Sequence, residues 1–366
     1  MSNTFVDLFC GAGGLSHGLI NAGWHPVAAI DNWQLAIDTY RHNMNSHSAY
    51  CLDISDIDEY DIFKILNRPP DWVVGGPPCQ GFSTVGRRRR EDPRNSLVKS
   101  FLKFVQVVNP KGVIIENVIG LKDMKFVEEI CLAFLEIGFY LTPTIIKAAD
   151  YGVPQLRKRI FFIGTKEPLA FEMPSPLLRP ESYVSVKDAI GDLPELSPGG
   201  CADSYNKEPF SKYQKMLRNG SKCIQGHEAS NHPKHLVKAI SFIPDGGNRF
   251  DIPTKYQPAS GYHNSYSRLH SNSPAVAVTQ NMGKPSGTRC IHPIQNRGLT
   301  AREGARLQGF PDSFHFMGGI TLQRLQIANA VSPILAKFIG ESISKSKSWH
   351  PFILQDKDSF VPVVNF

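Results

Sequence analysis

The sequence predicts an α/β protein with a doubly wound, mostly parallel sheet and a smaller, irregular, β-containing domain. Up to Thr165, short apolar runs alternate with amphipathic helical patterns joined by short loops. This alternation is typical of βαβ units, which form a parallel sheet with helices on both faces. Between Pro174 and Ile291 the periodicity fades, while Pro, Gly, Ser, Asn, His and Tyr become frequent. We therefore expect the second domain there.

The elements of the first domain follow from these patterns in order. Strands or extended segments are expected at 4–9, 25–31, 49–54, 71–76, 112–118, 142–148 and 159–165, with helices at 15–24, 32–44, 96–108 and 126–138. In an open sheet of this kind, ligands bind at the carboxyl ends of the strands. The three most unusual loops, FCGAGG, GGPPCQ and ENV, all fall at that edge.

A helical pattern returns after the irregular segment. Thr300 and Glu303 have the spacing of a capping box at the start of the helical segment 299–310, and 322–343 is predicted to be one more amphipathic helix. The predicted boundaries are 1–173 for the first part of the first domain, 174–291 for the second domain, 292–345 for the return of the chain to the first domain, and 346–366 for a C-terminal tail.

The composition limits the class of protein. Over 366 residues, 41% hydrophobic and 20% charged residues indicate a folded chain rather than a disordered one. The N-terminus lacks a basic segment followed by a long apolar one, and no apolar run is long enough to span a membrane, so we expect a cytoplasmic protein. Seven cysteines without a CxxC pair or a zinc-like His/Cys cluster indicate reduced thiols and no structural metal.

The charge and one unusual loop point to chemistry. A net charge of +7 favours polyanionic partners. The run Arg87–Arg90 is either a solvated surface, partly neutralised by Glu91 and Asp92, or a loop that contacts phosphates. Just before it, Cys79 follows two prolines in the glycine-rich segment GGPPCQGFS. Prolines stiffen a backbone, and glycines let it turn sharply and approach a ligand. Cys79 is therefore either a nucleophile on a rigid loop or a small buried hydrophobe.

The loop after the first strand has the form of a cofactor-binding turn. A strand, a glycine loop and a helix in succession present backbone amides to an anionic or polar ligand. The dinucleotide fingerprint G-x-G-x-x-G requires a glycine at position 16, where this chain has Ser16. Asp31 and Asp53 end the next two elements, and each is either a helix N-cap or a ligand for the hydroxyls or the amine of an adenosine. S-adenosylmethionine fits this pattern better than NAD.

Six motifs together carry a family resemblance. The chain contains, in this order, FVDLFCGAGGLSHGL, GGPPCQGFS, ENV at 116–118, QLRKR at 155–159, LTAREGARLQGFPD at 299–312 and QIANAVSP at 326–333. This arrangement resembles the C5-cytosine-specific DNA methyltransferases of the bacterial modification type, over residues 4–164 and 298–340. The resemblance implies a Rossmann-like, S-adenosylmethionine-dependent catalytic lobe and a target-recognition domain over 174–291.

The resemblance also implies the catalytic residues. Cys79 would add to C6 of a cytosine rotated out of the duplex, which makes C5 nucleophilic. Glu116 would bind or protonate N3, and Arg159, with Arg157 nearby, would stabilise charge at O2. Asn117 would brace the Cys79 loop through its amide. Neither the sequence nor the resemblance identifies the base that removes the C5 proton.

The binding residues implied by the resemblance form two sets. The cofactor set consists of Phe9, Gly11, Gly13, Gly14, Leu15, Asp31, Asn32, Trp33, Asp53, Ile54, Pro78, Leu97 and Asn329. Two positions depart from the family pattern, because Asn32 separates the acid from Trp33 and an alanine rather than a glycine precedes Asn329.

The DNA set consists of Ser83, Thr84, Arg87, Arg88, Arg89, Arg90 and Gln155. All but Gln155 lie on residues 80–96, the segment expected to close over the flipped base. Candidates for base readout lie within 262–289, where the pattern singles out no residue. Arg302 and Arg306 lie four apart on one helix and are expected to be structural.

The expected partner is double-stranded DNA. A monomer is sufficient for the reaction, with no obligate protein partner, and a cognate restriction endonuclease would act on the same sequence. A nicotinamide-dependent oxidoreductase is disfavoured by Ser16 and by the PPC and ENV loops. A non-catalytic DNA-binding protein is disfavoured because Cys79, Glu116 and Arg159 are all retained. A tRNA-methylating member of the family is disfavoured because no Cys-Phe-Thr segment occurs between residues 165 and 300.

Overall fold

The chain folds into two units, each described here by itself. The computed structural model describes residues 2–45, 48–78, 95–118, 124–258, 265–287 and 289–351. The first unit is made of residues 1–147, 158–176 and 335–366, and the second of residues 148–157 and 177–334. The second unit contains residues 148–157 besides 177–334, and the helix after Thr300 packs within it. The expected domain boundaries at 173, 291 and 345 stay a prediction.

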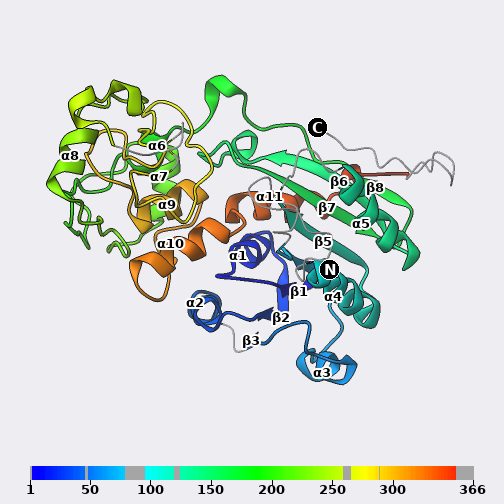
Figure 1. The fold of residues 1–366 in the computed structure, drawn as a ribbon. Coiled ribbons are helices and arrows are strands. Elements are labelled where there is room, and N and C mark those ends of the chain that lie inside the picture. The colour runs from blue at the N-terminus through cyan, green and yellow to red at the C-terminus, as the bar shows by residue number, and fades with distance from the viewer. Residues whose placement is uncertain are drawn as a thin grey trace. The chain divides into compact units, whose positions relative to one another are not determined.

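A seven-stranded sheet forms the centre of the first unit. Its strands are β1 (Thr4–Leu8), β2 (His25–Asp31), β3 (Ala49–Cys51), β4 (Trp72–Gly75), β5 (Gly112–Asn117), β6 (Tyr140–Lys147) and β7 (Lys158–Thr165). They lie in the order β3-β2-β1-β4-β5-β7-β6 (Figure 1). Strand β7 runs opposite to the other six, so both of its pairings, with β5 and with β6, are antiparallel. The predicted doubly wound, mostly parallel α/β fold is confirmed. The strand order reverses between β1 and β4, which is where such sheets bind ligands.

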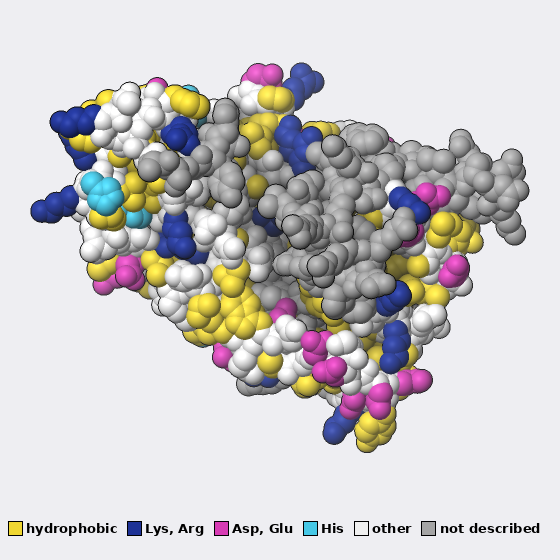
Figure 2. All heavy atoms as spheres, in the orientation of Figure 1, with side chains coloured by type: hydrophobic (Ala, Val, Ile, Leu, Met, Phe, Trp, Pro, Cys, Tyr) yellow, Lys and Arg dark blue, Asp and Glu magenta, His cyan; other side chains and the backbone are white. Residues whose placement is uncertain are grey.

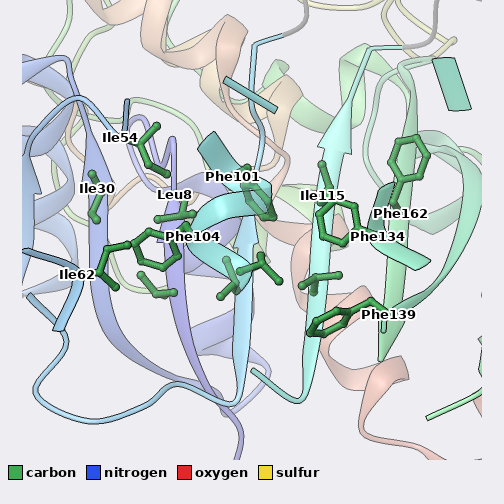
Figure 3. Packing of buried hydrophobic residues seen from close by; sticks show 14 of the residues in the cluster. Leu8, Ile30, Ile54, Ile62, Phe101, Phe104, Ile115, Phe134, Phe139 and Phe162 are labelled. Atoms are coloured by element: carbon green, nitrogen blue, oxygen red, sulfur yellow. The ribbon is translucent and has the colours of Figure 1, made fainter. Parts of the chain in front are cut away.

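Helices of the first unit cover this sheet. They are α1 (Gly14–Asn21), α2 (Gln34–Met44), α3 (Glu59–Ile65), α4 (Asn95–Val108), α5 (Met124–Glu136) and most of α11 (Pro333–Ile343). Figure 3 shows Phe101, Phe104 and Phe134 from α4 and α5 packed on apolar side chains of the strands, all with at most 1% of their surface exposed. Burying one such side chain stabilises the fold by roughly 1.5–3 kcal/mol. None of the described helices is both long and apolar enough to cross a bilayer.

Two features of the first unit were not predicted. The short helix α3 begins with a capping box between Asp58 and Asp61. Part of the expected tail forms β9 (Trp349–Pro351), which pairs antiparallel with β8 (Leu169–Phe171).

The prediction of a single helix at 322–343 is wrong. The segment forms two helices, α10 (Ile320–Asn329) and α11, because Pro333 has no amide hydrogen to continue a helical ladder.

The second unit consists of short helices and ordered loops. Its α-helices are α6 (Val186–Ile190), α7 (Lys212–Arg218), α8 (Lys234–Ile240), α9 (Ala301–Gln308) and α10, with 3₁₀ turns at η2 (Ala148–Tyr151), η3 (Pro180–Ser182), η4 (Arg249–Asp251) and η5 (Thr254–Tyr256). A further turn, η6 (Ser346–Ser348), precedes β9 in the first unit. Within the described part of the second unit, β structure is limited to isolated bridges, so the expected strands are not seen there. Lysine and arginine side chains gather over α8 (Figure 2), where Lys234 and Lys238 are exposed.

Arginine side chains hold these loops in place. Arg268 is 4% exposed and donates hydrogen bonds to the backbone carbonyl oxygens of Ile240, Ile243, His292 and Gln295. Arg302 donates in the same way to the carbonyl oxygens of Gln225, Pro311 and Phe314. Arg306 forms buried ion pairs with Asp192 and Asp312. Arg302 and Arg306 are therefore part of the interior of the second unit.

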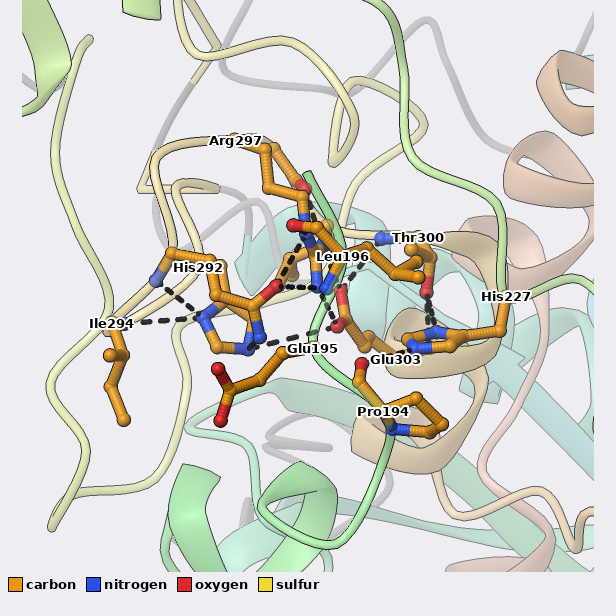
Figure 4. Close-up of polar contacts among 12 residues, drawn as sticks. Pro194, Glu195, Leu196, His227, His292, Ile294, Arg297, Thr300 and Glu303 are labelled. Carbon is orange, nitrogen blue, oxygen red and sulfur yellow. Dashed lines mark hydrogen bonds and ion pairs between the residues drawn. The ribbon is translucent and has the colours of Figure 1, made fainter. Parts of the chain in front are cut away.

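A buried ion pair lies at the start of α9. Arg297 donates to the two carboxylate oxygens of Glu303 over 2.9 and 2.6 Å, and His292 and His227 lie beside them (Figure 4). Burial acts to raise the pKa of Glu303, but the charge and hydrogen bonds of Arg297 outweigh it, so this pKa lies well below its usual range. Burial lowers the pKa of His292 to about 4. The predicted capping box between Thr300 and Glu303 is confirmed.

Candidate active site

The turn between β1 and α1 leaves its backbone open on one side. Phe9, Gly11 and Gly13 have φ values of 58°, 52° and 92°, in the left-handed region that favours glycine. A Cβ built on Gly13 would lie 2.7 Å from Cδ2 of Tyr40, whereas one built on Gly11 would meet no atom within 4 Å. The space next to Gly13 is therefore filled by the packed chain, whereas the space next to Gly11 is free.

Two carboxylates lie at the ends of β2 and β3. Asp31 accepts hydrogen bonds from the amides of Gly11 (2.8 Å) and Trp33 (2.9 Å), and Asp53 accepts one from Nδ2 of Asn32 (3.0 Å). Burial raises the pKa of Asp31, whereas hydrogen bonds, first of all from Ser55, lower that of Asp53. Neither acid is a helix cap, because the N-cap residues of α2 and α3 are Trp33 and Asp58. Asp31 is thus bonded to the glycine turn, and Asp53 is linked to Asp31 through Asn32, the residue that follows Asp31.

A buried network under the glycine turn was not predicted. Asp7 on β1 is 1% exposed and accepts a hydrogen bond of 2.5 Å from Ser16, which in turn accepts one of 3.0 Å from Tyr40. Burial raises the pKa of Asp7 to about 7, and its Oδ1 has no hydrogen-bond partner among the residues that the structure describes. The signal was present in the sequence as one acid inside the apolar run TFVDLF. Ser16, which replaces the expected fingerprint glycine, belongs to this network.

The loop that leads to Cys79 lies against the end of β5. Nδ2 of Asn117 donates a hydrogen bond of 3.4 Å to the carbonyl oxygen of Pro77. Oε2 of Glu116 would lie 3.3 Å from a Cβ on Gly76. Pro78, the last described residue before Cys79, is exposed. Cys79 itself and the predicted DNA-contacting residues Ser83, Thr84 and Arg87–Arg90 lie outside the described residues.

Glu116 and Arg159 form an ion pair beside this loop. Nε of Arg159 lies 2.9 Å from Oε1 of Glu116, and the two side chains are 19% and 13% exposed. The Nε–H group makes no hydrogen bond with any described residue, so its contact with Glu116 is electrostatic, while Nη1 donates to the carbonyl oxygen of Lys158. The site therefore places one carboxylate and one guanidinium, both within reach of solvent, at the end of β5.

Comparison with known proteins decides the family. Residues 3–345 match the family model described as C-5 cytosine-specific DNA methylase. The chain belongs to this family. It is a DNA (cytosine-5) methyltransferase, and the nicotinamide-dependent oxidoreductase considered from the sequence is excluded.

Relatives of this DNA methylase extend over nearly its whole length. It is 39% identical over 352 residues to the type II methyltransferase M1.HphI of Haemophilus parahaemolyticus, covering 94% of this chain and 87% of that one. It is 38% identical to M.DdeI of Desulfomicrobium norvegicum, covering 93% and 88%. A solved structure titled as a putative DNA modification methyltransferase encoded within a prophage of E. coli is similar with a TM-score of 0.76 and 28% identity, over 93% of this chain and 98% of that one.

The remaining predicted residues of this DNA methylase have different positions. Leu15 and Ile54 are buried, and Phe9 and Leu97 are half-buried against the apolar core. Trp33 is half-buried and Asn32 exposed. Arg157 is 7% exposed and precedes β7, and Asn329 is an exposed residue at the end of α10. Arg157 and Asn329 belong to the second unit.

The expected DNA contact by Gln155 is corrected by the structure. Gln155 has no exposed surface, and its amide nitrogen donates to Leu307 O (3.1 Å) and Gln308 Oε1 (2.6 Å). Its oxygen accepts from the amide of Val278 over 2.8 Å. A side chain whose polar groups are all used internally has none to present to DNA. Gln155 also lies outside the strand, because β7 begins only at Lys158.

Proposed function

We propose that this DNA methylase transfers a methyl group from S-adenosylmethionine to C5 of a flipped-out cytosine through a covalent bond between Cys79 and C6. The supporting observation is the Glu116–Arg159 pair beside the loop that leads to Cys79. An acid and a cation at one strand end suit a reaction in which negative charge develops on a ring that must also bind a proton.

The proposed chemistry begins at the thiolate of Cys79. C5 of cytosine is a poor nucleophile because its electrons belong to an aromatic ring. When the sulfur bonds to C6, the C5–C6 double bond opens and C5 becomes enamine-like. After C5 has accepted the methyl group, its proton leaves, the C6–sulfur bond breaks, and the double bond and the thiolate form again. A thiol suits this role because it is a strong nucleophile and also leaves readily.

The neighbouring residues have proposed roles at the rest of the ring. Glu116 holds a proton at N3, where electron density accumulates after the attack. Arg159 stabilises negative charge at O2 and orients the carboxyl group of Glu116, with which it is already paired. Asn117 fixes the backbone of the Cys79 loop through its bond to Pro77. Arg157, which lies just before β7, is proposed to help stabilise the negative charge at O2.

S-adenosylmethionine would supply the methyl group as an electrophilic carbon, and S-adenosylhomocysteine would leave as the product. The residues fit this group, since the space above Gly11 admits a ligand to the backbone of the turn. The linked carboxylates of Asp31 and Asp53 are acceptors for ribose hydroxyls and an adenine amine. The proposed cofactor-binding residues are Phe9, Gly11, Gly13, Gly14, Leu15, Asp31, Asn32, Trp33, Asp53, Ile54, Pro78, Leu97 and Asn329.

Duplex DNA is the substrate of this family, and a base inside a duplex must be extruded before a thiol can reach it. We propose that residues 80–96 contact the extruded strand, with Ser83 or Thr84 filling the vacated space and Arg87–Arg90 binding phosphates. Because two relatives are named type II methyltransferases, we further propose that the chain acts in the cytoplasm as the modification half of a restriction–modification system. A monomer is sufficient for this task.

The test is whole-genome bisulfite sequencing in a bacterial host that lacks DNA methylation. The wild-type chain should protect cytosines in one short sequence context. Cys79→Ser should abolish protection, while Cys201→Ser, which alters an exposed cysteine of the second unit, should leave it unchanged. DNA with 5-fluorocytosine in that context should trap the wild-type protein covalently, because the departing proton is replaced by fluorine. An unmethylated genome with soluble protein would refute DNA modification, and tRNA would be assayed next.

A further inference from the structure

The structure selects among the candidates for base readout between residues 262 and 289. Of the described polar residues there, Ser265, Ser267, Arg268 and Ser271 are at most 8% exposed. The guanidinium of Arg268 donates to four backbone carbonyl oxygens and to Oδ1 of Asn296. These residues face the interior and have no surface to present to DNA. Longer polar side chains that are exposed remain mainly in the last third of the segment.

Residues 279–287 form a compact double turn. Backbone amides of Met282, Lys284 and Gly287 donate to the carbonyl oxygens of Thr279, Asn281 and Lys284 over 3.0, 2.8 and 2.7 Å. The thiol of Cys290 donates to the same Lys284 oxygen over 2.6 Å, which closes the turn on itself. We name residues 279–287 together with Arg289 the recognition turn.

The recognition turn is mounted on the interior of the second unit. Met282 is 1% exposed, and its sulfur packs so closely on Gly304 of α9 that a Cβ there would be 2.2 Å away. Its carbonyl oxygen accepts from the amide of Leu299 over 2.8 Å. Just before the turn, the buried amide of Gln155 holds Val278. The backbone of the recognition turn is therefore fixed by packing and hydrogen bonds to several elements.

Four long polar side chains project from this fixed backbone. Gln280, Asn281, Lys284 and Arg289 are exposed, and none makes a side-chain hydrogen bond or ion pair with another described residue. Arg289 also has φ of 38°, a conformation that non-glycine residues adopt rarely and that is often retained at functional sites. A rigid backbone that displays unused amide and cationic groups is an arrangement suited to reading a ligand with specific hydrogen bonds.

We propose that the recognition turn is the DNA base-reading surface of this enzyme, an inference that rests on the proposed function. Paired donor and acceptor groups of Gln280 and Asn281 match N6 and N7 of adenine in the major groove. The guanidinium of Arg289 matches O6 and N7 of guanine, and Lys284 contributes a phosphate contact. The recognised sequence therefore contains an A·T pair and a G·C pair besides the target cytosine's own pair.

The experiment uses the full-length protein and short duplexes. The context methylated by the wild type is determined first by whole-genome sequencing, which tests the proposed function by itself. Affinities are then measured for a duplex with that context and for duplexes with each base pair replaced in turn. The variants are Gln280→Ala, Asn281→Ala, Arg289→Ala and Lys284→Ala. The controls are Asn206→Ala and Lys234→Ala, which change exposed residues of the same unit outside the segment 262–289.

The expected results differ by residue. Gln280→Ala, Asn281→Ala or Arg289→Ala should lower discrimination at one base pair by about 10- to 100-fold and leave the other positions unchanged. Lys284→Ala should weaken binding to all duplexes alike and make it less dependent on salt. Melting temperatures should match that of the wild type, because the altered side chains are exposed. If the wild type methylates one context but all variants discriminate as Asn206→Ala does, the inference is overturned while the proposed function stands.

Discussion

Three glycine-to-alanine substitutions in and near the turn between β1 and α1 distinguish the effect of packing strain from the effect of lost ligand contact. Gly11, Gly13 and Gly23 all have positive φ, so alanine at any of them costs roughly 1–2 kcal/mol of backbone strain. Only at Gly13 would the new methyl also meet Tyr40 at 2.7 Å and Met44 at 3.0 Å, adding about 1–3 kcal/mol of overpacking. We therefore expect Gly13→Ala to lower the free energy of unfolding by about 2–5 kcal/mol, and Gly11→Ala and Gly23→Ala by about 1–2 kcal/mol.

Cofactor affinity should rank the same variants differently. At Gly11 the methyl would enter the open space above the turn, so S-adenosylmethionine should bind at least about tenfold more weakly although the fold is little affected. Gly23 lies at the end of α1, away from the turn, and its variant should bind as the wild type does. Denaturant unfolding measures the first quantity and calorimetric titration the second. Unchanged affinity in Gly11→Ala would refute the assignment of the cofactor to this turn, and equal stability of the Gly11 and Gly13 variants would refute the packing argument.

Three further predictions concern single side chains. The folded protein lowers the pKa of His292 to about 4, so between pH 7 and 5 this residue takes up a proton in the unfolded chain but not in the folded one. The free energy of unfolding should therefore be lower at pH 5 than at pH 7, by about 2 kcal/mol from this residue. His292→Gln should shrink the measured pH dependence of unfolding by that amount, and an identical pH profile would contradict it. Asn117→Ala removes the bond to Pro77 and should slow single-turnover methylation by roughly 10- to 100-fold at unchanged cofactor affinity. Weaker cofactor binding would instead implicate the glycine turn. Glu116→Gln cannot supply a proton and should slow the same step by about 10²- to 10⁴-fold, whereas a near-normal rate would exclude proton transfer from this residue.

Periodicity predicts the strands of the first unit well, because each is an apolar run buried on both faces. It does not predict their order, and in particular that β7 lies between β5 and β6, since strand pairing depends on contacts distant in sequence. Periodicity does not predict helix α3. Its start is determined by the Asp58 capping box, and two of its apolar side chains, Tyr60 and Phe63, are 72% and 56% exposed rather than facing the core. An apolar stripe facing the core is the signal that periodicity detects, and α3 lacks a full one.

The site is predicted less evenly than the sheet. Motifs identify Asp31, Asn117, Glu116 and Arg159, whose contacts follow from their places at strand ends. Alternation alone misplaces Gln155, because one bridge to Ala275 and two bonds to α9 hold it inside the second unit. In that unit, buried arginines replace much of the apolar packing that sequence patterns reveal. A charged residue in a loop is ordinarily predicted to face water, so these interior contacts have no signature in the sequence.

Two arginines of the second unit, Arg268 and Arg302, bind mainly backbone carbonyl oxygens. Arg268 and Arg302 donate to seven carbonyl oxygens between them. A carbonyl oxygen is present whatever amino acid occupies the position, so substitutions along the held loops leave these bonds intact. The exposed loop residues can therefore drift in sequence while the scaffold beneath them keeps its shape. Such a scaffold lets the exposed loop residues change by few mutations and without compensating changes in the core.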